Sequence, residues 1–187
     1  MNLVETEKQK YDEVWTTDDY KDHSPGQAHA ENFLKTVEPH AGQSIIDIGC
    51  GQGLAGLRFE EHGLRTWYLD LTDSALEKAV PRNQFIQSPI WGKWQKKPLG
   101  WDYGYCCDVM EHIPPEFVML SLDRIVSNCR LTWFMVCNKL DSMGEIFGKP
   151  LHLTVQPYLW WKERIAMVGT IKDARDLAGV SMFLVAR

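Results

Sequence analysis

Apolar and polar positions follow two alternating patterns along the chain. Short apolar runs rich in branched and aromatic side chains, such as 44–48 and 131–137, predict strands. The run at 131–137 is apolar except for Thr132, as expected for a central strand covered on both faces. Between these runs lie longer segments with helical spacing and turn residues. The alternation predicts a parallel sheet with helices on both faces.

Capping and breaking residues set the boundaries of the expected helices. Ser24 and Pro25 form an N-cap and first-turn pair, which predicts a helix that ends near residue 37. Gly63 ends a second helix, and Thr72 predicts the cap of a short helix that reaches residue 80. The expected strands cover 44–48, 66–69, 84–86, 101–107, 131–137, 170–173 and 180–185. The other expected helices cover 54–62, a segment from about residue 114, and 157–168.

Length, composition and charge narrow the class of protein. A chain of 187 residues with 44% apolar residues is enough for one domain with its own core. The net charge is −5 with both signs mixed, so no basic stripe is available for a nucleic-acid duplex. The first residues are polar, and no apolar run approaches the roughly 20 residues that span a membrane. We therefore expect a cytoplasmic protein with no membrane contact.

The cysteines favour buried free thiols over disulfides. There are five, an odd number, and they lie in apolar, strand-like segments. No C-x-x-C pair is present, so their spacing matches no zinc pattern. We expect a reducing compartment and no bound metal.

A glycine-rich loop at 47–53 carries the strongest functional signal. It follows an expected strand directly and precedes an expected helix. Glycine allows a tight turn and a close approach by a ligand, and the helix behind it presents amide groups and a positive dipole. The overlapping segment 51–56 also fits the dinucleotide pattern G-x-G-x-x-G. The loop alone therefore leaves NAD, S-adenosylmethionine (SAM) and a plain tight turn open.

Asp70 ends the second expected strand. A carboxylate at this place can accept hydrogen bonds from both hydroxyl groups of a ribose. The alternative is a solvated residue at the end of a strand. Its spacing from the glycine loop favours the ribose interpretation.

Two further features resemble the class I SAM-dependent methyltransferase superfamily, particularly its small-molecule and ubiquinone-biosynthesis-like branch. One is Asp47, which stands before the glycines in Asp-Ile-Gly-Cys-Gly-Gln-Gly. The other is the segment 107–114, in which the fourth expected strand leads into Glu111, His112, Ile113 and Pro114. The resemblance covers roughly residues 40–140. It implies a methyltransferase that uses SAM.

The resemblance also implies where the cofactor lies. The glycines of the loop line the methionine and ribose parts, and Asp70 binds the ribose hydroxyl groups. The segment 87–89 borders the adenine, although it lacks the acidic residue that many relatives have there, so Ser88 and nearby backbone are expected to replace it. Tyr11, Trp15 and Tyr20 are candidates for a lid, with simple packing as the alternative. The expected cofactor-binding residues are Asp47, Gly49, Cys50, Gly51, Gly53, Asp70, Leu71, Gln87, Ser88, Asp108 and Tyr20.

The closing segment of the chain resembles the antiparallel hairpin that ends methyltransferase sheets. The expected fold is therefore α/β and doubly wound, with a mostly parallel seven-stranded sheet, a C-terminal antiparallel hairpin and helices on both faces. We expect a single domain over 1–187, with an N-terminal lid or helix segment at 1–40 and a Rossmann-like core at 43–187. This length leaves no room for the substrate domain that a nicotinamide dehydrogenase usually adds.

Methyl transfer from a sulfonium needs an aligned nucleophile and the exclusion of water. A base helps when the acceptor is a hydroxyl group. His112 and His152 follow expected strands at the ligand-binding edge and are candidate catalytic bases, with structural loop residues as the alternative. Trp160 or Trp161 is expected to border the same pocket.

We expect transfer to an O, N or S atom of a small molecule, by a monomer or a homodimer. The alternatives are a nucleic-acid or protein methyltransferase, an NAD(P)-dependent oxidoreductase and a SAM-binding module without activity. Segment 108–111 departs from the Asp/Asn-Pro-Pro-aromatic tetrad of amino-directed DNA enzymes, so we expect no nucleic-acid partner.

Overall fold

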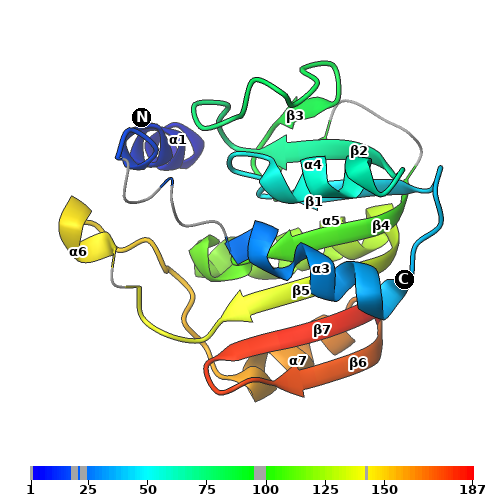
Figure 1. Cartoon of the computed structure of the whole chain (residues 1–187). Helices are drawn as coiled ribbons and strands as arrows, with labels where there is room; N and C mark the ends of the chain where they lie inside the picture. The colour runs from blue at the N-terminus through cyan, green and yellow to red at the C-terminus, as the bar shows by residue number, and fades with distance from the viewer. Residues whose placement is uncertain (1, 18–20, 22–24, 95–99, 142) are drawn as a thin grey trace. The chain divides into compact units, whose positions relative to one another are not determined.

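The structure is a computed structural model, which describes residues 2–17, 21, 25–94, 100–141 and 143–187 (Figure 1). Tyr20, an expected cofactor contact, lies outside the described residues. The chain forms two compact units, Met1–Lys96 and Lys97–Arg187, called here the N-terminal and C-terminal units. The strand order is β3-β2-β1-β4-β5-β7-β6.

The N-terminal unit is built around three parallel strands. β1 pairs with β2, and β2 pairs with β3. All five residues of β1 are buried, as expected for a central strand of a parallel sheet that is covered on both faces. Tyr68 of β2 packs with Leu76, Val80 and Phe85 in a buried cluster beside the glycine loop. The elements of this unit are α1 (Leu3–Val14), α3 (Pro25–Val37), β1 (Ser44–Ile48), α4 (Leu54–Glu61), β2 (Arg65–Asp70) and β3 (Phe85–Gln87).

The helix expected from Thr72 to residue 80 is wrong. This segment forms successive turns, in which Leu76 N–H donates to Asp73 and Val80 N–H to Glu77. The hydroxyl group of Thr72 accepts from Ser74 N–H at 3.2 Å and also donates to Asp12 of α1. Local bonds of this kind offer the backbone an alternative to a helix.

The C-terminal unit joins a parallel pair of strands to an antiparallel hairpin. β4 pairs with β5 in parallel, whereas β7 runs antiparallel to both β5 and β6. With the strand order above, this confirms the expected doubly wound sheet and its closing hairpin. The elements are β4 (Trp101–Cys107), η1 (Met110–His112), η2 (Pro115–Phe117), α5 (Val118–Asn128), β5 (Cys129–Cys137), α6 (Gly144–Phe147), α7 (Tyr158–Ala166), β6 (Thr170–Asp176) and β7 (Val180–Ala186).

All five cysteines are free thiols, as expected, and Cys106, Cys107 and Cys129 are buried. In the described part of the chain, no helix has the length and apolar character to cross a bilayer.

Candidate functional site

The glycine loop of the N-terminal unit is held by backbone hydrogen bonds. Gly49, Gly51 and Gly53 have φ angles of 69°, 51° and 80°, a region that glycine enters without steric cost. The N–H groups of Gly49 and Cys50 both donate to the carbonyl of Leu69, at 2.8 and 3.1 Å. The loop therefore keeps its shape without using its own side chains.

Close packing also requires glycine at the end of the loop. A Cβ atom at Gly53 would lie 2.6 Å from Val80 Cγ2 and 3.3 Å from Tyr68 Cε1. Gly53 is the N-cap of α4 and provides no side-chain cap, so the first amide groups of this helix need acceptors from elsewhere.

Asp47 joins β1 to the start of α4. Its Oδ2 accepts a hydrogen bond from Gly56 N–H at 3.0 Å, and its side chain is buried. The pKa of Asp47 is raised to about 7, mainly by burial and also by the nearby charge of Asp70, while the bond from Gly56 opposes the rise. The carboxylate thus fixes the helix behind the loop.

Asp70 connects the end of β2 to the loop. Oδ2 accepts from Gly51 N–H at 2.8 Å, and Oδ1 accepts from Thr72 N–H at 3.2 Å. Burial raises the pKa of Asp70, while the bonds from Gly51, Thr72 and Leu71 oppose that rise. Each carboxylate oxygen has further acceptor capacity, so this group can still receive two ribose hydroxyl groups.

The helix α1 lies against the same loop. A Cβ atom at Gly51 would be 2.9 Å from Cζ2 of Trp15, so the indole ring lies directly on this glycine. Asp12 accepts a hydrogen bond from the Thr72 hydroxyl group and pairs with Lys8 at 2.6 Å. Trp15, a candidate for the lid, therefore contacts the loop.

The segment after β3 supplies the remaining expected contacts. Gln87 is exposed, and its side chain donates to the carbonyl of Leu71 at 3.4 Å. Ser88 N–H donates to the carbonyl of Asp70 at 2.9 Å, and its hydroxyl group bonds the carbonyl of Pro89 at 3.1 Å. Ser88 therefore orients this segment through its backbone.

Gln52 is a loop residue that the sequence reasoning missed. Its Oε1 atom is buried and makes no hydrogen bond within the described residues. A buried acceptor without a donor is costly, so a ligand with N–H or O–H groups would be favoured here. Together with the glycines and Asp70, this acceptor fits the ribose, amino group and sulfonium charge of SAM.

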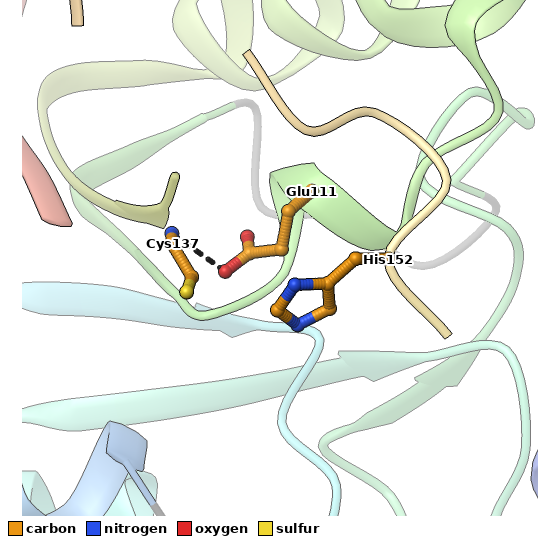
Figure 2. Close-up of side chains that lie close together, drawn as sticks. All are labelled: Glu111, Cys137 and His152. Carbon is orange, nitrogen blue, oxygen red and sulfur yellow. Dashed lines mark hydrogen bonds between the residues drawn. The ribbon is translucent and has the colours of Figure 1, made fainter. Parts of the chain in front are cut away.

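The C-terminal unit has its own cluster of polar side chains after β4. Asp108 follows the strand with a φ of 59°, and its N–H donates to the carbonyl of Met135 at 2.9 Å. Glu111 comes next, in η1, and is fully buried. Its Oε1 accepts from Cys137 N–H at 2.7 Å (Figure 2). Its carbonyl accepts from Leu153 and Thr154 N–H at 2.8 Å each.

Glu111 is the second residue whose position was not anticipated. Its side chain fixes the end of β5 and its backbone fixes the segment that carries His152. Burial raises the pKa of Glu111 well above its usual range, and the neighbouring Asp108 raises it further. The Glu-His pair in the sequence was the available signal, but it did not show what Glu111 would contact.

His112 and His152 lie side by side. Their ring centroids are 4.6 Å apart, with an edge-on interplanar angle of 85°. Nδ1 of His152 also bonds the carbonyl of Lys139 at 2.7 Å. The structure therefore brings together the two expected bases, which lie far apart in the sequence.

The two expected pocket tryptophans differ in environment. Trp161 is fully buried in the core of the C-terminal unit. Trp160 is half-buried, and the guanidinium of Arg164 lies 3.4 Å from its ring centroid. Trp160 is thus the one with an accessible face, and a role beside an acceptor stays a prediction.

No protein-family model matches the chain. The ubiquinone biosynthesis O-methyltransferase of Vibrio atlanticus is 25% identical over 114 residues, which cover 57% of this chain and 48% of that protein. The chain thus spans about half the length of the curated relatives it matches.

Two solved structures share the fold over nearly the whole chain. A chain in the complex of the Haloferax volcanii Trm112 methyltransferase activator with a putative methyltransferase has a TM-score of 0.74 at 12% identity and covers 96% of both chains. Magnesium protoporphyrin IX methyltransferase of Synechocystis, solved with S-adenosylhomocysteine (SAH), has a TM-score of 0.67 at 17% identity, covering 91% of this chain and 87% of that one. The chain has the class I SAM-dependent methyltransferase fold and is distantly homologous to ubiquinone biosynthesis O-methyltransferases.

Proposed function

We propose that this chain, with its class I methyltransferase fold, is a SAM-dependent methyltransferase that acts on a small molecule. The observation that carries the proposal is the bond from Gly51 N–H to Asp70 at 2.8 Å, which joins the glycine loop to the residue expected to hold the ribose. The buried acceptor of Gln52 supports the same cofactor.

The residues of the N-terminal unit bind and orient the cofactor. Asp70 accepts the ribose hydroxyl groups, and the backbone of Gly49, Gly51 and Gly53 allows close approach. Bound SAM supplies a methyl group on a sulfonium, which is already activated for in-line displacement. The carboxylates of Asp47 and Asp70 favour this cationic ligand electrostatically.

The residues of the C-terminal unit serve the acceptor. The paired rings of His112 and His152 provide two imidazole groups, either of which can remove a proton from a hydroxyl acceptor. We favour an oxygen acceptor, since the relative from Vibrio atlanticus is named a ubiquinone biosynthesis O-methyltransferase. Amine and sulfur acceptors need less help from a base.

Incubation with radiolabelled SAM and separate pools of small molecules, protein and nucleic acid tests this function. We expect label in a small-molecule pool and a marked loss with Asp70→Ala. Asp73→Ala, which removes an exposed carboxylate of the following turn, is the matched control and should retain activity. Label in protein or nucleic acid, or in no pool at all, would contradict the proposal.

A further inference from the structure

Three segments of the C-terminal unit place different metal-binding side chains together. Glu111 comes from η1, Cys137 ends β5, and His152 lies after the long connection that follows β5. One ligand atom from each lies within 4.8 Å of the others, and Figure 2 shows the three side chains gathered around one point.

The buried carboxylate points independently to a cation. Glu111 is fully buried, and its Oε2 accepts no hydrogen bond from an N–H group in the described part of the chain; its side-chain neighbour is another acid, Asp108. Asp108 and His112 form a second set with the same carboxylate, also within 4.8 Å, so another acidic group is close. A buried polar atom without a partner is costly, and coordination of a metal ion removes that cost.

We propose that Glu111, Cys137 and His152 bind a divalent transition-metal ion, with zinc as the preferred metal. Thiolate and imidazole ligands favour zinc, whereas magnesium and calcium prefer sites made of oxygen atoms. A tetrahedral zinc ion holds its ligand atoms about 3.3–3.8 Å apart, so movements of about 1 Å complete the site.

The neighbours of the three ligands suit this role. The bond between His152 Nδ1 and the carbonyl of Lys139 fixes the orientation and the tautomer of the ring, which is the usual arrangement for a histidine that binds a metal. The bond from Cys137 N–H fixes Oε1 of Glu111 and leaves Oε2 for the ion.

A site with three protein ligands leaves one coordination position open, as in catalytic rather than structural zinc sites. Such an ion lowers the pKa of a bound hydroxyl group and would favour an oxygen acceptor. With the ion bound, both nitrogens of His152 are occupied, so the general base is His112 alone. This consequence rests on the proposed function. Metal binding itself is measured without SAM, so the metal site and the proposed function can each fail independently.

Titration of metal-free protein with Co²⁺ and with Zn²⁺ tests the site. We expect a thiolate-to-cobalt absorption band in the near ultraviolet, and zinc binding by calorimetry at one ion per chain. Cys137→Ala should remove the band, and Cys137→Ala and His152→Gln should each weaken zinc binding at least about tenfold. Glu111→Gln should weaken it similarly while keeping the Oε1 acceptor for Cys137 N–H.

Matched controls separate this site from other thiols and imidazoles. Cys129 begins the strand that Cys137 ends, so Cys129→Ala removes a thiol roughly 26 Å away and should leave the band intact. His40→Gln removes an exposed histidine of the other unit. Zinc should also raise the melting temperature of the wild type but not of Cys137→Ala.

Two results would overturn the proposal. One is zinc affinity that is the same in the wild type and in Cys137→Ala. The other is magnesium binding through the set with Asp108 and His112 that does not depend on Cys137 or His152.

Discussion

The glycine loop and the cluster around Glu111 are built in opposite ways. The loop is one continuous segment, held by backbone bonds to the neighbouring strand and closed by Asp70. The cluster draws side chains from three segments, and Glu111 holds them together through both its carboxylate and its backbone carbonyl. A site made of local backbone can be read from sequence order, whereas one made of distant side chains depends on the tertiary fold.

The largest expected effect breaks the loop alone. Gly51→Val places a branched side chain at a φ of 51°, where its Cβ meets the ring of Trp15 at 2.9 Å. We expect SAM binding to be lost in calorimetry. Gly42→Ala is the control, because its φ of 86° is equally demanding but no atom lies within 4 Å. If Gly42→Ala loses SAM binding as well, backbone strain rather than the loop's fit to a ligand explains the loss.

Replacing His112 or His152 tests the cluster around Glu111. His112→Gln or His152→Gln should lower kcat with a hydroxyl acceptor by roughly 10²–10⁴-fold, the usual contribution of a general base. SAM affinity should stay unchanged, since neither ring belongs to the N-terminal unit. Steady-state rates with separate SAM titrations check both points. Unchanged rates in both variants would remove the pair from the chemistry.

Asp70→Ala measures how strongly SAM binding depends on the carboxylate that accepts from the loop. Loss of hydrogen bonds to a charged group should weaken SAM binding by about 1.5–3 kcal/mol, roughly 10- to 150-fold. The melting temperature should fall modestly, because the N–H groups of Gly51 and Thr72 lose this acceptor. Equal affinities in the variant and the wild type would show that the ribose assignment is wrong.

A smaller effect concerns pH. The pKa of Asp47 is raised from 3.8 to about 7, so the folded protein holds this proton while the unfolded chain releases it. The free energy of unfolding should therefore fall as pH rises between about 4 and 7. Asp47→Asn keeps an acceptor for Gly56 N–H, and its stability should depend less on pH across that range.

Chemical denaturation at several pH values measures this difference between wild type and variant. Asp73→Asn, at an exposed position, is the control. Parallel stability curves for the wild type and Asp47→Asn would contradict the assignment.

The difference between the two regions also explains what the sequence could predict. The strands, the hairpin and the glycine loop follow from local patterns, and the structure has them near the expected residues. The helix after Thr72 was wrong because the hydroxyl group of Thr72 bonds Ser74 N–H locally and also Asp12, which lies far away in the sequence. No spacing rule connects Cys137 to Glu111 and His152, so the expectation of no metal could not take their proximity into account.

Calorimetric titration of the wild type with SAM, SAH and NAD in parallel tests the central claim most directly. The account predicts saturable binding of SAM and SAH, weakened in Asp70→Ala but not in Asp73→Ala, and no binding of NAD. Tight binding of NAD with no heat from SAM would contradict it.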